Sequence, residues 1–181
     1  MPRSILIAYA TKHGSTREVA DSLAAVLFAL DFDVERLPAA QVDDLSPYDG
    51  VVVGGSLYTG RWHPDALDFL KRHRRALAEI PVAVFALGPR TIEAKDVAAS
   101  RTQLDRALAK AAGIEPFAVA IFGGVLDPRK LRFPFSRMQP SDARDWDAIH
   151  AWGEGIADTF RYGKPASMPR DLRSELQQTP R

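Results

Sequence analysis

Cysteine is absent from this chain of 181 residues, and so is every kind of chemistry that needs it. Without cysteine there are no disulfides, no thiolate-bound iron–sulfur clusters and no thiol catalysis, so a bound cofactor must carry any redox reaction. No apolar run approaches the roughly 20 residues that a membrane-spanning helix needs. Basic residues (24) nearly balance acidic ones (23), and the resulting net charge of +1 argues against a nucleic-acid binder, which needs a strong positive field.

The rest of the composition indicates one folded domain. Apolar residues make up 46% and charged residues 26%, which is typical of a globular protein rather than a disordered one. The start, Met1–Ser4, leads directly into an apolar run and leaves no room for a signal peptide, so a cytoplasmic protein is expected. Residues 163–181 contain three prolines and few apolar residues. We therefore predict a folded domain over 1–162 and a flexible tail over 163–181.

Short apolar runs without polar alternation recur along the chain and are typical of strands buried on both faces of a parallel sheet. We expect such strands at residues 5–10, 51–55, 82–87 and 117–122, with a weaker edge strand at 33–37. Helical patterns lie between and after them, at residues 16–30, 64–77, 96–112 and 145–160. This alternation predicts right-handed crossovers and a doubly wound α/β fold with a five-stranded parallel sheet.

The first apolar run, Ile5–Ala10, leads into the hydroxyl-rich turn Thr11–Thr16 and then into a helical pattern. Such a turn presents backbone N–H groups and the positive end of a helix to a phosphate, and Gly14 lets the backbone approach it closely. The turn contains neither the Gly-Lys-Ser/Thr of a Walker loop nor a G-x-G-x-x-G motif. It also lacks the acidic residues of a phosphoacceptor receiver domain. An ordinary turn capped by Ser15 or Thr16 is the alternative.

This turn resembles the flavodoxin phosphate loop, T/S-x-T-G-x-T, with His13 in place of the second hydroxyl residue. The resemblance implies FMN as cofactor, with its phosphate held largely by neutral hydrogen bonds. It also implies the strand order 2-1-3-4-5 in a three-layer α/β/α sandwich, with ligands at the carboxyl ends of strands one, three and four. The implied phosphate-binding residues are Thr11, Lys12, His13, Gly14, Ser15 and Thr16.

The segments after strands three and four should then flank the flavin ring. Glycines in the loop 54–64 let backbone amides approach a ligand, and Tyr58 and Trp62 can stack on a planar ring. Arg90, after strand four, would favour an anionic reduced flavin. His63 and Arg90 are candidate proton or charge partners, and a hydrogen bond at a helix start is the alternative for His63. The predicted ring-framing residues are Ser56, Leu57, Tyr58, Thr59, Gly60, Gly88, Pro89, Arg90 and Thr91.

The pattern G-x-S-x-x-x-G-x-x-H over residues 54–63 resembles the flavodoxin-like branch that includes menaquinone-dependent protoporphyrinogen IX dehydrogenase. Further likeness lies in Gly123–Leu126 and in Asp145-Trp146, so the resemblance covers residues 4 to 160. It implies a quinone-coupled FMN oxidoreductase that acts on a porphyrinogen in heme biosynthesis. A flavodoxin-type electron carrier served by a reductase, and a flavin-free scaffold, are the alternatives. Carriers of this family are usually strongly acidic, unlike this chain. No metal site is predicted.

A basic, aromatic segment, residues 127–140, lies between the last predicted strand and the last predicted helix, and we call it the insert. Its cations are Arg129, Lys130, Arg132 and Arg137, interleaved with Leu131, Phe133, Phe135 and Met138. Three roles fit this composition: peripheral contact of residues 129–138 with the inner face of a membrane, lining of a pocket for an apolar carboxylated substrate, or closure of the core. Three prolines oppose a regular amphipathic helix.

Overall fold

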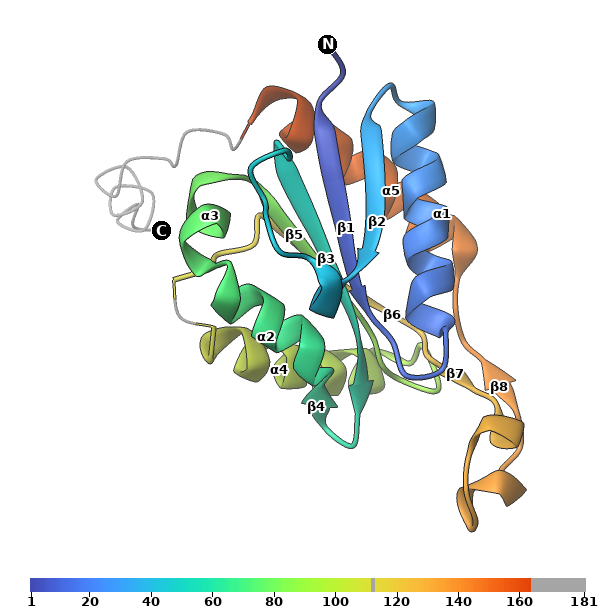
Figure 1. The fold of residues 1–181 in the computed structure, drawn as a ribbon. Coiled ribbons are helices and arrows are strands. Elements are labelled where there is room, and N and C mark those ends of the chain that lie inside the picture. The colour runs from blue at the N-terminus through green and yellow to red at the C-terminus, as the bar shows by residue number, and fades with distance from the viewer. Residues whose placement is uncertain (112, 164–181) are drawn as a thin grey trace, which may run out of the picture.

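Five parallel strands form the central sheet in the order β2-β1-β3-β5-β6 (Figure 1). The structure, a computed structural model, describes residues 1–111 and 113–163. The strands are β1 (Ser4–Ala10), β2 (Asp33–Pro38), β3 (Gly50–Tyr58), β5 (Val82–Leu87) and β6 (Ala118–Phe122). Counted along the chain, their order is 2-1-3-4-5, so the predicted topology is confirmed, including the edge position of β2.

Helices cover both faces of this sheet, as predicted for a three-layer α/β/α sandwich (Figure 1). The helices α1 (Ser15–Ala29) and α5 (Trp146–Tyr162) pack on one face. The other face is covered by α2 (Pro64–Arg72), α3 (Arg74–Glu79) and α4 (Ala94–Ala109). Consecutive β1 side chains enter opposite cores: Ile5 and Ile7 pack beneath α1, whereas Leu6 packs with Phe69 of α2. From Ile5 to Ala10 the strand is apolar at every position because both of its faces are buried.

Three predicted boundaries are corrected. The predicted helix 64–77 is two helices that meet at His73, where Arg72 and His73 bond to backbone carbonyls of the segment 39–42. The predicted helix 96–112 begins at Ala94 and ends at Ala109, close to the left-handed residue Gly113. The predicted strand 51–55 continues to Tyr58, so residues 54–64 are not simply a loop.

Strand β3 continues because it forms a hairpin with β4 (Arg61–Trp62). The two turn residues, Thr59 and Gly60, have φ values of 45° and 78°. Positive φ at both central residues is the geometry that matches a tight turn to the twist of a hairpin. The hairpin therefore extends beyond the main sheet at its carboxyl edge, where it forms one wall of the site described below.

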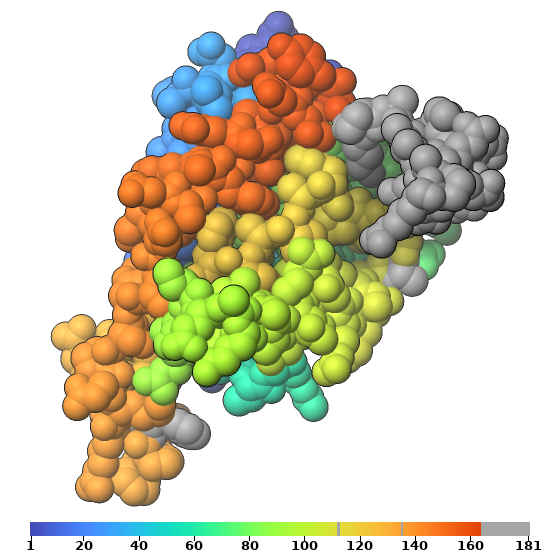
Figure 2. Space-filling model, turned by 180° about the vertical axis from the view of Figure 1, so that it is seen from behind, coloured from blue at the N-terminus to red at the C-terminus, as the bar shows by residue number. Residues whose placement is uncertain are grey.

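The insert leaves the sheet after β6 between two short paired strands, β7 (Val125–Leu126) and β8 (Ser141–Asp142). Between these strands it forms two short 3₁₀ turns, Pro128–Lys130 and Phe135–Arg137. Seen from behind, it is a lobe that projects beyond the body of the molecule (Figure 2). Within residues 1–111 and 113–163, no helix is long and apolar enough to cross a membrane. Of the tail predicted at 163–181, residues 164–181 lie outside the described part.

Candidate functional site

A cavity of about 640 Å³ lies at the carboxyl ends of β1, β3 and β5, between the β3–β4 hairpin and the insert. This is the edge of a doubly wound sheet at which ligands bind. Nine of the predicted site residues line it: Lys12, His13, Ser15, Ser56, Leu57, Tyr58, Thr59, Gly88 and Arg90. The structure thus brings together residues from all three segments that the sequence singled out.

The phosphate loop, residues 11–16, has an open helix end. Gly14 lies in the left-handed region with φ 97°, and its N–H donates to Thr11 Oγ1 at 2.9 Å. Helix α1 begins at Ser15, and no described side chain caps it, so neither Ser15 nor Thr16 acts as the cap considered above. The first N–H groups of a helix have no partner within it. They are free to bind an anion at the positive end of the helix dipole.

Three polar side-chain atoms around this loop are buried without a hydrogen-bond partner among the described residues: His13 Nε2, Thr16 Oγ1 and Ser56 Oγ. Thr16 is fully buried, and Ser56 is 8% exposed. A buried polar atom left without a partner costs about 1–3 kcal/mol. A ligand with hydrogen-bonding groups would remove that cost, and all three residues belong to the predicted cofactor site. A fourth such atom, Ser141 Oγ, lies in β8 beside the insert.

The cavity is lined by four permanent cations, namely Lys12, Arg90, Lys130 and Arg132. None of the described residues that line it is acidic, although the chain has 23 acidic residues. Burial lowers the pKa of His13, and the charges of Lys12 and Lys130 lower it further, against a small opposing effect of Asp127. The site therefore favours a ligand that carries negative charge.

The aromatic residues of the β3–β4 hairpin divide between the cavity and the core. The Tyr58 ring lies 5.9 Å from the His13 ring and 5.4 Å from Lys12 Nζ, and its desolvation raises the pKa of the phenol. Trp62, by contrast, is 3% exposed, and its Nε1–H donates to Gly55 O at 3.1 Å. The expectation that Trp62 stacks on a ligand is therefore corrected, because its indole packs in the hydrophobic core.

The remaining predicted residues lie around the cavity rather than in its wall. Thr11, Gly14 and Thr16 shape the phosphate loop, and Gly60 forms the hairpin turn. Pro89 accepts a hydrogen bond from the Gly124 N–H at 2.8 Å. Thr91 donates to the Asp96 carboxylate.

His63 lies outside the set of residues that line the cavity. It is the N-cap of α2, where its Nδ1 accepts a hydrogen bond from the Asp65 N–H at 3.3 Å. Its position therefore matches the alternative of a hydrogen bond at a helix start. Arg90 differs because it lines both this cavity and a neighbouring one of about 790 Å³. Of the two candidate charge partners, Arg90 is thus the one that reaches the site.

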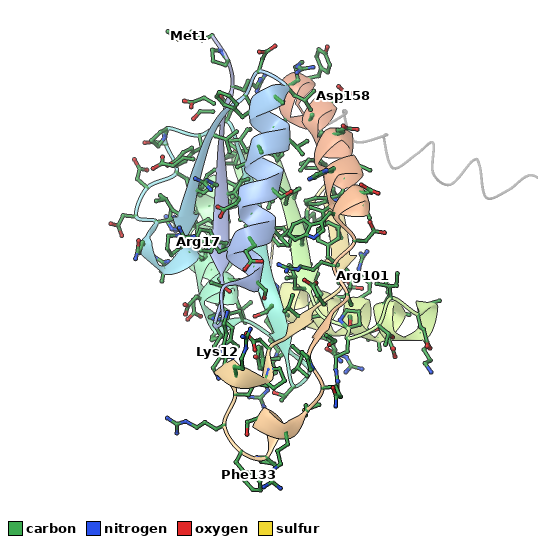
Figure 3. All side chains as sticks on the ribbon, turned by 90° about the vertical axis from the view of Figure 1, so that its right-hand side faces the viewer. Met1, Lys12, Arg17, Arg101, Phe133 and Asp158 are labelled. Carbon is green, nitrogen blue, oxygen red and sulfur yellow. The ribbon has the colours of Figure 1, made fainter. Side chains whose placement is uncertain are left out.

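The other wall comes from residues outside the predicted cofactor-binding set, although lining a pocket was one of the three roles considered for the insert. They follow β6 and continue into the insert: Gly124, Val125, Leu126, Lys130, Leu131, Arg132 and Met138. Lys130 Nζ donates to His13 O at 2.9 Å, which joins the insert to the phosphate loop. In Figure 3, Lys12 lies where this loop meets the insert, and Phe133 lies at the far tip. The glycine pair 123–124 and the adjacent cations were the sequence signal for this wall.

Comparison with known proteins gives one family and two kinds of relative. The family model described as "Flavodoxin domain" matches residues 6–138. Protoporphyrinogen IX dehydrogenase [quinone] of Escherichia coli K12 is 32% identical over 84 residues, and the same match is found in the O157:H7 strain. This match covers 45% of the chain and 46% of the relative, so the chain spans just under half the length of the curated relatives it matches.

Solved structures with the same fold are flavodoxins. A short-chain flavodoxin associated with a non-canonical PDU bacterial microcompartment superposes with a TM-score of 0.57 at 22% identity, over 88% of this chain and 99% of the other. The flavodoxin of Streptococcus pneumoniae TIGR4 gives a TM-score of 0.57 at 20% identity, over 86% and 99%. At this level of identity the likeness shows the fold alone.

Proposed function

This chain belongs to the flavodoxin family, and we propose that it is an FMN-binding oxidoreductase. The observation that carries the proposal is a cavity whose one end is an uncapped helix N-terminus and whose wall holds four cations and no acid among the described residues. FMN has a phosphate at one end and, at the other, a ring that gains negative charge on reduction. The cavity offers a complementary group at each place.

The described residues fit FMN in size and in chemistry. A volume of about 640 Å³ lies within the range of about 300–1,000 Å³ that small-molecule sites occupy. The phosphate loop would hold the phosphate through its backbone N–H groups and the buried hydroxyl of Thr16. Ser56 and Tyr58 on one wall, with Gly88 and Arg90 on another, would frame the ring. When bound, FMN supplies hydride or electron transfer, and the protein supplies binding, orientation and charge.

We propose further that the reaction is that of a quinone-coupled dehydrogenase rather than that of a carrier. Cations around the ring stabilise negative charge there, which makes reduction of the cofactor by an organic substrate more favourable. The net charge of +1 agrees with this, as does the 32% match to protoporphyrinogen IX dehydrogenase over 84 residues. Arg90 and Arg132 would stabilise that charge, and a quinone would accept the electrons.

The proposed substrate class is a porphyrinogen, the class named by the curated relative. Its carboxylates suit the cations at the cavity, and its apolar body suits Val125, Leu126 and Met138. At the tip of the insert, Phe133 is 71% exposed, and Arg137 Cζ lies 5.2 Å from the centre of its ring. This pair favours a peripheral contact of residues 129–138 with an anionic membrane surface, where a quinone would be found.

An electron carrier without its own organic substrate is the second candidate. The observation in its favour is that the flavodoxin family model matches residues 6–138, whereas the match to the dehydrogenase spans only 84 residues. The two candidates differ in whether bound FMN is reduced in two separate one-electron steps or in one two-electron step. A carrier should be reduced in two separate one-electron steps, whereas a dehydrogenase need show only one two-electron step.

Anaerobic turnover tests the proposal. The protein is loaded with FMN, mixed with protoporphyrinogen IX and a menaquinone analogue, and porphyrin formation is followed by its fluorescence. Turnover that depends on both FMN and the quinone is expected. Bound FMN without turnover would favour the carrier, and a failure to bind FMN would refute both candidates.

A further inference from the structure

We propose that Lys130, on the insert, binds the phosphate of the cofactor together with His13, so that this flavodoxin-type loop recognises phosphate by charge. The inference rests on the proposed function, because it concerns the ligand of that same site. It assigns the insert a defined role: the insert closes the phosphate end of the cavity. If the loop bound the phosphate through neutral groups alone, the insert would not contact the cofactor.

Lys130 is held at the phosphate loop although 117 residues separate it from His13 in the sequence. Its ammonium group donates one hydrogen bond, at 2.9 Å, to the carbonyl of His13. An ammonium group has three N–H protons, so two remain for another acceptor. Lys130 is also part of the wall of the main cavity. A phosphate bound at the loop would thus meet a cation that is already in place.

His13 supplies the second observation. Its Nε2 is buried and has no hydrogen-bond partner among the described residues. With Ser15 and Lys130, it lines a pocket of about 160 Å³ beside the main cavity. In the protein without a ligand, burial and the neighbouring cations keep the pKa of His13 low. A bound phosphate has the opposite effect and would favour the protonated, donating ring.

Two carboxylates also line this small pocket, but both are engaged by arginines. Asp127 pairs with Arg129, with Nε to Oδ1 at 3.1 Å. Glu18 pairs with Arg144, with Nη1 to Oε2 at 2.5 Å, and that arginine side chain is only 8% exposed. The charged and titratable groups near His13 are therefore Lys12, Lys130, these two paired acids and the Tyr58 phenol, whose pKa is raised by desolvation so that it stays neutral. Lys12 and Lys130 carry the positive charge that is not paired with either acid.

Comparison of FMN with riboflavin, which lacks the phosphate, isolates this contribution. Kd is measured by flavin fluorescence for wild type, Lys130→Met and Arg137→Met, at low and at high salt. Arg137→Met is the control. It removes a cation that is exposed on the insert but does not line the cavity. Lys130→Met should weaken FMN about tenfold, as expected for one charge-assisted hydrogen bond, reduce its salt dependence, and leave riboflavin within twofold of wild type.

The outcomes separate the two proposals. An equal loss of FMN and riboflavin affinity in Lys130→Met, or no loss of either, would overturn the phosphate role of Lys130 while FMN binding by the wild type still stands. If the wild type bound neither flavin, the proposed function would fall and this inference with it. Arg137→Met with the same FMN-selective loss would show that general charge, not Lys130, is responsible.

Limited proteolysis gives an independent readout. Trypsin can cut after Arg137, which is exposed on the insert. A phosphate that bridges Lys130 and the phosphate loop should hold the insert in place, so FMN should slow this cut in the wild type and riboflavin should not. Lys130→Met should abolish the protection at FMN concentrations that saturate both proteins. Equal protection in the variant would contradict the proposal.

Discussion

The positive lining of the cavity predicts how replacing its arginines changes the redox chemistry. Arg90 and Arg132 line the cavity, and both side chains are exposed at its edge. Each can be replaced by glutamine, which keeps a polar, hydrogen-bonding side chain, although a shorter one, and removes the charge. Both variants, and the double variant, should lower the two-electron midpoint potential of bound FMN because reduction adds negative charge to the ring.

The cavity volume sets the size of the effect. A sphere of about 640 Å³ has a radius of about 5 Å, so a lining guanidinium lies roughly 7 Å from the centre. At that distance, with an effective dielectric constant between those of a protein surface and water, one charge contributes roughly 1 kcal/mol. For a two-electron couple, this corresponds to about 20 mV for each arginine. The double variant should therefore lie about 40 mV below wild type.

An anaerobic titration with a reference dye of known potential measures this shift for each variant. Arg137→Gln, on the insert but outside the cavity wall, is the matched control and should stay within a few millivolts of wild type. Circular dichroism verifies that each variant is folded. Unchanged or raised potentials in both arginine variants, with FMN still bound, would refute the electrostatic reasoning and favour the carrier.

Three further predictions concern the buried polar atoms that have no hydrogen-bond partner among the described residues, and the tight packing beneath the site. Ser56→Ala should leave the empty protein at least as stable in a thermal melt, since a buried hydroxyl without a partner is removed, but should weaken FMN by about fivefold. Gly54→Ala would place a Cβ 2.1 Å from Phe85 Cζ and should cost about 1–3 kcal/mol in urea unfolding. Gly155→Ala, whose Cβ would meet no atom of the described residues within 4 Å, should cost nothing. Because the pKa of His13 is lowered in the folded chain, acid destabilises the protein as the pH falls through about 6.5. His13→Gln should therefore lose less stability than wild type between pH 7.5 and 5.5, and an identical loss would contradict the burial of a neutral ring.

Local patterns were sufficient to predict the sheet and one half of the site. Strands buried on both faces are recognisable because every side chain in them is apolar, as in Ile5–Ala10. The parallel order of the strands then brings the phosphate loop, Ser56 and Arg90 to one edge. Each of these residues follows a predicted strand within a few positions, or lies in its extension, so the sequence alone places them near one another.

The other half of the site depends on contacts between distant segments. Nothing local in the sequence shows that Lys130 reaches the carbonyl of His13, because its neighbours form only a short 3₁₀ turn. The burial of the Trp62 side chain depends on the turn at Thr59–Gly60. This turn folds the strand back and places the indole over Gly55. Tertiary packing decided these features, and a propensity pattern does not contain that information.

Calorimetric titration with FMN is the most direct test of the central claim, that the cavity beside the phosphate loop holds this cofactor. We predict one FMN per chain with a micromolar or lower Kd, and weaker binding of riboflavin because the helix end and the cations would have no phosphate to hold. Absence of binding heat at any temperature tried, together with unchanged flavin fluorescence, would contradict it.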